Sequence, residues 1–306
     1  MSSSQIVIYA DNTNVPITGL IGSSCTIAIQ AFLYSEDGST LQMDYPLQAA
    51  VQDPSIISST KENGKRKVLV SVGGEVFASS AWKAAASDVS SFASQIAAFV
   101  EKYNFDGVDI DWEDTGAISD GSYDPTTFLL DLSSALKSAL PSSQNFITHA
   151  PQCPYFYTGS DLDIYSTIAK NAGDNIDLFN IQYYNNDWYV GSSGSDEEEK
   201  VAGLTGSSVF PSSIMGIKAQ GLDVSKMLVG KPTTSDNASS GYLDDDDLAS
   251  YVVTPLAKEL GSDFGGVMGW QFATSASSSD NVLSWIEAMN SAIEAGSSST
   301  STQAAE

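Results

Sequence analysis

The stretch NFDGVDIDWED (residues 104–114) alternates acids with apolar side chains. Asp109, Asp111 and Glu113 stand at every second position, and apolar residues occupy the positions between them. Side chains two residues apart on a β-strand share a face and lie roughly 6–7 Å apart, so the three acids form one row. Because an isolated buried carboxylate is costly, a strand that keeps this row inside a protein needs a reason beyond packing.

Short apolar strands recur along the chain, and most are followed by a helical pattern. The β-rich runs lie at residues 5–10, 26–33, 67–74, 106–113, 145–152, 177–184, 226–232 and 265–272. Helical spacing occurs at residues 87–103, 126–140, 161–172, 244–260 and 280–294. Eight strand–helix units in 306 residues predict an α/β fold with a single (β/α)8 TIM barrel.

An open doubly wound sheet is the other fold with this alternation. Its first strand is usually followed by a glycine-rich phosphate turn, whereas DNTNVP (11–16) stands here. We therefore expect a (β/α)8 catalytic domain at residues 1–294 and a disordered Ser/Thr-rich tail at 295–306. Residues 11–24 are expected to lack a helix, and residues 191–205 to form an exposed loop.

In a barrel the acid row faces the interior and climbs toward the carboxyl end, where barrel active sites lie. Three neighbouring buried acids cannot all ionise cheaply, so they share protons, and Glu113 at the mouth is the natural general acid. Asp106 has the opposite parity and is interpreted as a structural cap at the start of the strand. An exposed edge strand would not alternate acids with core residues, and a cation site would need further acids at other strand ends, which the sequence does not indicate.

Composition limits the partners. The net charge is −25, which disfavours nucleic acid and anionic membrane surfaces and leaves neutral glycans or peptides open. No apolar run reaches membrane-spanning length, and the first ten residues lack the pattern of a secretory leader. We expect a monomer, and its location stays open between secreted or cell-wall-associated and intracellular.

Cysteine and histidine are scarce. The chain has two cysteines, Cys25 and Cys153, and one histidine, His149, which offers no metal-ligand spacing. We expect no metal and no organic cofactor. Whether the two cysteines pair is not decided by the sequence.

The motif DGVDIDWE (106–113) resembles the signature of family 18 glycoside hydrolases, Asp-Gly-x-Asp-x-Asp-x-Glu. SVGG (71–74) resembles the third-strand motif of that family. APQCP (150–154), IQYYNN (181–186) and GGVMGW (265–270) resemble strand ends of the hevamine-like branch, which contains plant class III and fungal chitinases. The resemblance extends over roughly residues 5–290.

This resemblance implies a retaining mechanism in which the substrate's own acetamide is the nucleophile. Glu113 would protonate the glycosidic oxygen and later deprotonate water. Asp111 would orient the acetamide and balance the charge of the oxazolinium ion, and Asp109 would accept or share a proton. The substrate would then be a glycan with N-acetylglucosamine at the cleaved position.

Other positions match residues of the branch that contact the sugar or support the acids. Tyr184 would bond the acetamide oxygen beside Gln182, and Trp270 would form the floor under the scissile sugar. Tyr9 corresponds to a sugar-contacting tyrosine. The expected supporting residues at close backbone approach are Ser71, Gly73 and Gly74.

Three functions fit these motifs. The first is an endo-chitinase, the second is an endo-β-N-acetylglucosaminidase acting on the N-glycan core, and the third is a chitinase-like lectin without activity. The presence of Glu113 argues against the lectin. His149, where the branch usually has a small residue, is interpreted as a hydrogen-bonded core histidine. The second cysteine that the branch has after QYYNN is absent, so Cys153 lacks the partner that the resemblance would give it.

Overall fold

The computed structural model describes residues 4–13, 15–186, 194–204, 210–272 and 279–303. Its centre is a ring of eight parallel strands: β1 (Gln5–Ala10), β2 (Ile27–Tyr34), β4 (Lys67–Gly73), β5 (Gly107–Asp111), β6 (Phe146–His149), β7 (Leu178–Gln182), β8 (Met227–Pro232) and β9 (Gly266–Trp270). The short strand β3 (Gln42–Met43) pairs antiparallel with β2. All eight predicted strands are present, and the prediction of a single (β/α)8 barrel is confirmed.

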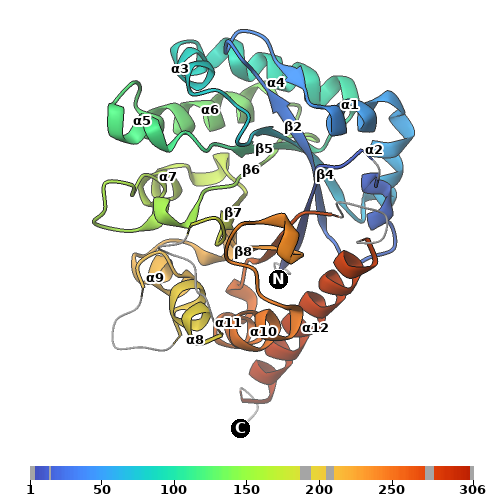
Figure 1. Ribbon diagram of the computed structural model, residues 1–306, viewed down its shortest axis with the longest axis vertical. Coiled ribbons are helices and arrows are strands. Elements are labelled where there is room, and N and C mark those ends of the chain that lie inside the picture. Colours follow the sequence, from blue (N-terminus) through green and yellow to red (C-terminus); the bar gives the residue numbers. More distant parts are fainter. Residues whose placement is uncertain (1–3, 14, 187–193, 205–209, 273–278, 304–306) are drawn as a thin grey trace.

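The ring closes through the first and last strands. β1 pairs with β9 on one side, with Gln5 opposite Gly266, and with β2 on the other, with Val7 opposite Ile27. Figure 1 looks onto the barrel and shows the helices arranged around the strands. The carboxyl ends of all eight parallel strands therefore meet at one face.

Helices follow the strands around the barrel. They are α1 (Tyr45–Gln52), α2 (Pro54–Thr60), α3 (Ser79–Ser87), α4 (Val89–Tyr103), α5 (Thr115–Asp120), α6 (Pro125–Ala139), α7 (Tyr165–Asn171), α8 (Gly194–Glu197), α9 (Ile214–Ala219), α10 (Asp245–Leu248), α11 (Thr254–Leu260) and α12 (Ser279–Gln303). The pattern predicted at residues 244–260 becomes α10 and α11, joined by a π-helical turn at Ala249–Val253. Residues 11–24 contain only one 3₁₀ turn, Ile17–Leu20, within the part of that segment that the structure describes.

Aspartates begin many of these helices. The carboxylates of Asp44, Asp88, Asp124 and Asp244 each accept a hydrogen bond from a backbone N–H of the first helical turn, at 2.9–3.1 Å. A carboxylate there satisfies an otherwise unpaired donor and lies at the positive end of the helix dipole. Part of the large negative charge therefore serves to begin helices.

The core has two layers that follow the parity of the strands. Val108, Ile110 and Trp112 are fully buried between the barrel and the helices. The barrel interior holds a separate apolar cluster that includes Val7, Ile29 and Met268. The alternation in β5 thus places apolar side chains under the helices and Asp109 and Asp111 inside the barrel.

The expectation of an exposed loop at residues 191–205 is wrong where the structure describes that segment. α8 and a π-helical turn (Glu198–Ala202) occupy it, and Val201 and Ala202 are buried. Glu197 is fully buried and forms a 2.9 Å ion pair with Lys231 of β8. The sequence did not indicate this contact, because Glu197 stands in a run of acids and its partner Lys231 is remote along the chain. Residues 191–193 and 205 lie outside the described residues.

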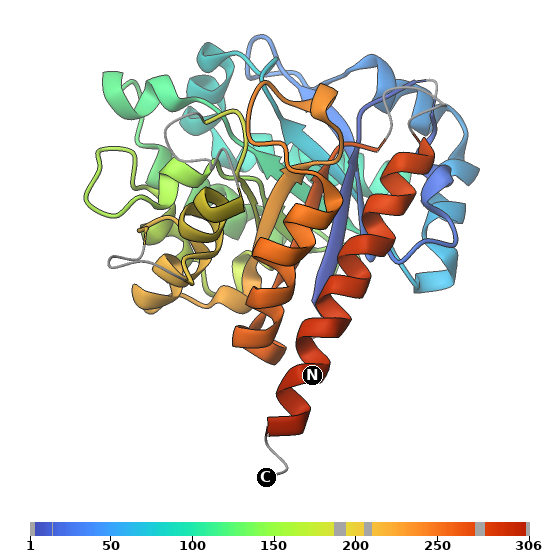
Figure 2. The ribbon, with the colours of Figure 1, turned by 60° about the horizontal axis from the view of Figure 1, so that its bottom comes forward.

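The C-terminal helix is longer than predicted. α12 continues to Gln303, so it replaces most of the disordered tail expected at 295–306; residues 304–306 lie outside the described part. Gly296 explains the extension: a Cβ there would lie only 2.6 Å from Ala257 Cβ and from the Thr254 carbonyl oxygen. The absence of a side chain at Gly296 lets α12 pack closely against α11, and Figure 2 shows α12 running along the outside of the barrel.

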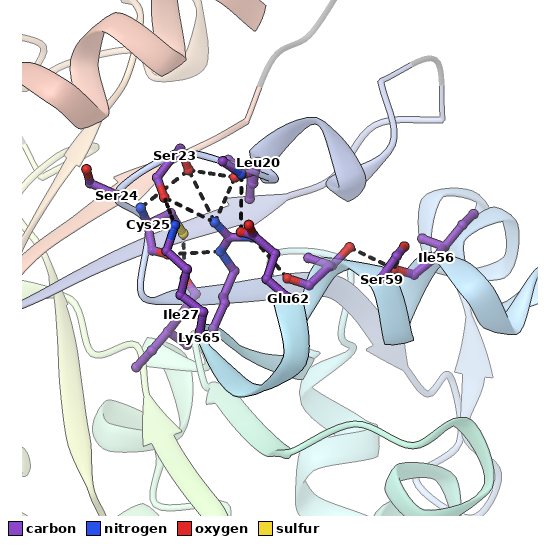
Figure 3. Close-up of polar contacts among 12 residues, drawn as sticks. Leu20, Ser23, Ser24, Cys25, Ile27, Ile56, Ser59, Glu62 and Lys65 are labelled. Atoms are coloured by element: carbon purple, nitrogen blue, oxygen red, sulfur yellow. Dashed lines mark hydrogen bonds and ion pairs between the residues drawn. The ribbon is translucent and has the colours of Figure 1, made fainter.

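A buried arginine lies near the opposite, amino-terminal end of the barrel, directly before β4. Arg66 is 1% exposed and donates to the carbonyl oxygens of Cys25 (2.9 Å), Thr60 (2.9 Å) and Leu20 (2.7 Å). Its guanidinium also forms a 2.9 Å ion pair with Glu62. Figure 3 shows Leu20, Cys25 and Glu62 converging on this point from separate segments. We call this group the Arg66 cluster.

No helix among the described residues is long and apolar enough to cross a membrane.

Candidate active site

A cavity of about 320 Å³ opens at the carboxyl end of the barrel. Asp111, Glu113, Gln182, Tyr184 and Trp270, which the sequence predicted as site residues, all contribute to its wall. The other lining residues are Asp11, Phe32, Asp44, Gly74, Glu75, Val76, Asn185 and Asn237. Most of the strand ends, or the loops that follow them, thus meet at one site, as barrel geometry requires.

Asp109 lies below this cavity and is completely buried. Its Oδ2 accepts hydrogen bonds from the hydroxyls of Tyr9 (2.8 Å) and Ser71 (2.7 Å). Its Oδ1 accepts from Thr148 Oγ1 (2.6 Å) and Asn180 Nδ2 (3.4 Å). Burial raises the pKa of Asp109 to about 6, against the lowering effect of these four donors. Asp109 is therefore fixed in position, and burial brings its pKa closer to neutrality.

Asp111 is turned toward Glu113, and the two carboxyl groups are hydrogen-bonded to each other. Gln182 lies against both of them. Its Nε2 donates to Asp111 Oδ1 (3.0 Å), to Glu113 Oε1 (3.0 Å) and to the Ala150 carbonyl oxygen (2.9 Å). One amide group therefore holds the acid pair in register with the barrel wall.

The electrostatics of the pair favour a bound proton. Burial, followed by the negative charges of Glu113 and Asp109, raises the pKa of Asp111 well above its usual range. Burial also raises the pKa of Glu113, and the nearby charge of Glu75 acts in the same direction, while the Gln182 hydrogen bond lowers it. Asp111 and Glu113 thus share a proton at a pH where isolated carboxylic acids have lost theirs.

Two aromatic side chains complete the reactive end of the cavity. Burial and the charges of the acid row raise the pKa of Tyr184 well above its usual value, so its hydroxyl keeps a proton to donate. Trp270, at the end of β9, lies with its ring centroid 5.8 Å from that of Tyr9 and 5.9 Å from that of Phe32. A partly exposed indole held by two rings offers a flat apolar surface.

Tyr9 has a different position from the one predicted. It was expected to contact a sugar, but it is 2% exposed, it does not line the cavity, and its hydroxyl is used by Asp109. The parity of β1 explains this. Tyr9 lies two residues after Val7 and shares its face, so both side chains point into the barrel, below the mouth.

Ser71 and Gly73 lie on β4 and Gly74 directly follows it, and all three are next to the acid row of β5. Ser71 and Gly73 are paired in register with Asp109 and Asp111. Gly73 has φ +129°, and a Cβ on it would collide with the Asp111 carbonyl oxygen. The Gly74 N–H donates to that same oxygen at 2.9 Å. Only glycine allows β4 to approach this closely.

Comparison with known proteins identifies the family. The model of the glycosyl hydrolases family 18 matches residues 5–301. The chain belongs to this family. A class III chitinase of Arthroderma benhamiae is 28% identical over 96% of this chain and 87% of its own length, and endochitinase 37 of Trichoderma harzianum is 30% identical over 68% and 64%. The crystal structure of a family 18 chitinase from Pseudoalteromonas aurantia is 29% identical, with a TM-score of 0.80 over 94% of this chain and all of that one.

Family 18 membership confirms the resemblance seen in the motifs and identifies the chain as a glycoside hydrolase. The residues that depart from the expected branch are structural. His149 is fully buried between Ser133 Oγ and the Tyr165 hydroxyl, each at 3.0 Å, and burial lowers its pKa to about 3. Cys25 and Cys153 are buried free thiols. Within the described ranges, no group of three or more His, Cys, Asp and Glu side chains could hold a metal ion.

Sequence reasoning missed several polar residues of the site. Asn180 could have been found, because it stands two residues before Gln182 and therefore shares its face on β7. Thr148 on β6 lies opposite Asp109 in register. The expectation that other strand ends add no further acids is wrong, since Asp11, Asp44 and Glu75 line the cavity. These three lie in loops, where no strand parity reveals direction.

Proposed function

We propose that this family 18 enzyme is a retaining endo-glycosidase that hydrolyses β-1,4 bonds between N-acetylglucosamine units of chitin by substrate-assisted catalysis. The observation that carries the proposal is the hydrogen-bonded Asp111–Glu113 pair, with Tyr184 and Trp270 in the same cavity wall. The chitinases among its relatives support chitin as the substrate.

In the first step the Glu113 carboxyl group gives its proton to the glycosidic oxygen, and the bond between that oxygen and C1 breaks. The acetamide oxygen of the same sugar forms the new bond to C1. The product is a cyclic oxazolinium ion, so no enzyme carboxylate becomes covalently attached.

In the second step a water molecule attacks C1 from the side that the leaving group vacated. The Glu113 carboxylate takes its proton, and the bond between C1 and the acetamide oxygen breaks. The two inversions at C1 retain the configuration, and Glu113 regains the proton that it donated.

Asp111 stabilises the intermediate through its place beside Glu113. Its carboxylate balances the positive charge that the acetamide acquires, and the Tyr184 hydroxyl donates a hydrogen bond to the acetamide oxygen. Asp109 is held below Asp111 by four hydrogen bonds, and its raised pKa lets it accept or share a proton when Asp111 turns toward Glu113. Tyr9 acts through Asp109 as a positioning residue.

The test compares the wild type with Glu113→Gln on chitohexaose, with products weighed by mass spectrometry. The wild type should release N-acetylated fragments whose new reducing end is first seen as the β-anomer by NMR. Glu113→Gln should lose on the order of 10²- to 10⁴-fold in kcat, the value of a general acid. Asp131→Asn, on the exposed part of α6, is the control and should keep full activity.

A parallel incubation with a high-mannose glycoprotein separates the alternatives. Cleavage of the glycoprotein core with chitohexaose left intact would replace the proposal by an endo-β-N-acetylglucosaminidase. Binding of chitohexaose without any cleavage would replace it by a lectin. Undiminished turnover by Glu113→Gln, or an initial α-anomer, would overturn the mechanism.

A further inference from the structure

Two aspartates that do not belong to the β5 row line the same cavity. Asp11 follows β1, and Asp44 lies between β3 and α1. Phe32 and Trp270 contribute to the same wall. The two acids therefore lie on the β1–β2 side of the cavity that contains Asp111 and Glu113.

Asp44 is held rigidly by the backbone. Its Oδ2 accepts from the Phe32 N–H and its Oδ1 from the Leu47 N–H of α1, both at 2.9 Å. Asp11 is hydrogen-bonded to it as the donor. Burial, followed by the charge of Asp44, raises the pKa of Asp11 to about 7. One proton thus lies between two carboxyl groups, of which one is fixed by the fold.

The charge of the cavity is strongly one-sided. Asp11, Asp44, Glu75, Asp111 and Glu113 line it, and none of its described lining residues is a lysine, arginine or histidine. The hydroxyls of a neutral sugar can donate hydrogen bonds to these carboxyl groups, but they do not cancel the repulsion between neighbouring negative charges. A cationic group on the ligand would offset this repulsion, because an ammonium ion donates to carboxylates and cancels their charge.

We propose that Asp11 and Asp44 bind the ammonium group of a deacetylated sugar, so that the enzyme prefers partly deacetylated chitin to the fully acetylated polymer. This inference rests on the proposed function. The cleaved sugar must keep its acetyl group because its amide attacks C1, so the glucosamine unit lies away from Glu113, on the β1–β2 side. When the ammonium group binds, the pair releases its shared proton to solvent and both carboxylates accept hydrogen bonds from it.

The test measures kcat/KM for chitohexaose and for a partly deacetylated hexamer. The variants are Asp11→Asn and the double variant Asp11→Asn/Asp44→Asn. Both substitutions keep the size of the side chain, and Asp44→Asn keeps an amide oxygen that can cap α1. Activity on the deacetylated hexamer should fall about tenfold more than activity on chitohexaose, as expected for lost hydrogen bonds to a charged group. Asp131→Asn is the matched control for removal of one negative charge and should leave the ratio unchanged.

Two further readouts test the chemistry. Mass-spectrometric sequencing of wild-type products should find glucosamine at one fixed distance from the new reducing end, and the double variant should lose this enrichment. Added salt should reduce the wild-type preference more than that of the double variant. If the double variant does not fold, Asp11→Asn alone supplies the same ratio.

The outcomes separate the two proposals. A wild type that cleaves neither substrate contradicts the proposed function. A wild type that cleaves chitohexaose, with both substrates affected equally by Asp11→Asn, overturns the ammonium site alone and makes the pair a binder of neutral hydroxyls.

Discussion

The two ends of the barrel bury charge in opposite ways. At the amino end, the guanidinium of the Arg66 cluster meets three carbonyl oxygens and the Glu62 carboxylate. At the carboxyl end, Asp109, Asp111 and Glu113 bury three acids without a cation within the described wall of the cavity. The first arrangement gives the buried cation hydrogen-bond acceptors and a counter-ion, whereas the second leaves like charges next to one another.

This difference separates stability from function. A fully partnered buried charge holds segments together, and its loss leaves several groups unpaired. A row of acids is held in place by neutral donors such as Gln182 and Ser71, and its repulsion is relieved by retaining protons. Substitutions at the amino end should therefore change stability, and those at the carboxyl end should change activity and its pH dependence.

The largest effect is expected from Asp111→Asn. The variant keeps the shape of the side chain but loses the charge that balances the intermediate, so kcat on chitohexaose should fall on the order of 10²- to 10³-fold. The free energy of unfolding at pH 7 should not fall, because burial and neighbouring charges disfavour ionised Asp111. Chemical denaturation and initial rates measure the two quantities. A stability loss as large as the activity loss would remove the distinction between the two ends.

Arg66→Met reverses this pattern. The substitution leaves three buried carbonyl oxygens without their donor, and the free energy of unfolding should fall by about 3 kcal/mol, since each unpaired buried acceptor costs roughly 1–3 kcal/mol. At a temperature where the variant is folded, its kcat should remain close to that of the wild type. Arg66→Lys keeps the charge but not the fork of donors, so it should lie between the two. A folded Arg66→Met with strongly reduced kcat would show that the amino end acts on the site.

His149 should produce an intermediate effect that depends on pH. Its folded pKa of about 3 lies below its ordinary value, so it stabilises the fold above pH 6.5, and this contribution is lost as the pH falls toward 3. Between pH 7 and pH 4, His149→Gln should lose about 3 kcal/mol less stability than the wild type. Asp109 has the opposite effect. Because its folded pKa is raised to about 6, its contribution to the free energy of unfolding decreases as the pH rises toward 6. Equal pH slopes for both proteins in denaturation experiments would mean that His149 is protonated in the fold.

Gln182→Met should give the smallest change, a shift of the pH profile. The Gln182 amide lowers the pKa of both Asp111 and Glu113, so its removal should move the basic limb of kcat/KM to higher pH. Gln144→Met is the matched control, because Gln144 donates to the Phe105 carbonyl oxygen at the other end of the barrel. A basic limb that does not move, or that moves downward, would mean that Gln182 only fills space.

The fold and the centre of the site could be predicted because both depend on local periodicity. Alternation in residues 106–113 determined which side chains enter the barrel, and the apolar runs gave all eight strands. Gln182 and Tyr184 came from the resemblance of IQYYNN to the family 18 branch, and their spacing of two residues agrees with it. Ser71 and Gly73 came from the resemblance of SVGG, and the register of β4 with β5 places them opposite Asp109 and Asp111.

The sequence failed where position depends on partners that are remote along the chain. Glu197 lay in a run that suggested a solvated loop, but it pairs with Lys231 inside the protein. The Ser-rich end of the chain suggested disorder, but Gly296 packs on α11. Asp11 and Asp44 meet only because the loops after two neighbouring strands converge, which no periodicity in either loop reveals.

The pairing of β1 with β9 also orders events during synthesis. The Tyr9 ring leaves the ribosome long before the Trp270 ring that packs on it is made. A nascent polypeptide can align its acids on β5 long before it has a pocket. The active site is therefore completed late, when β9 pairs with β1 and closes the barrel.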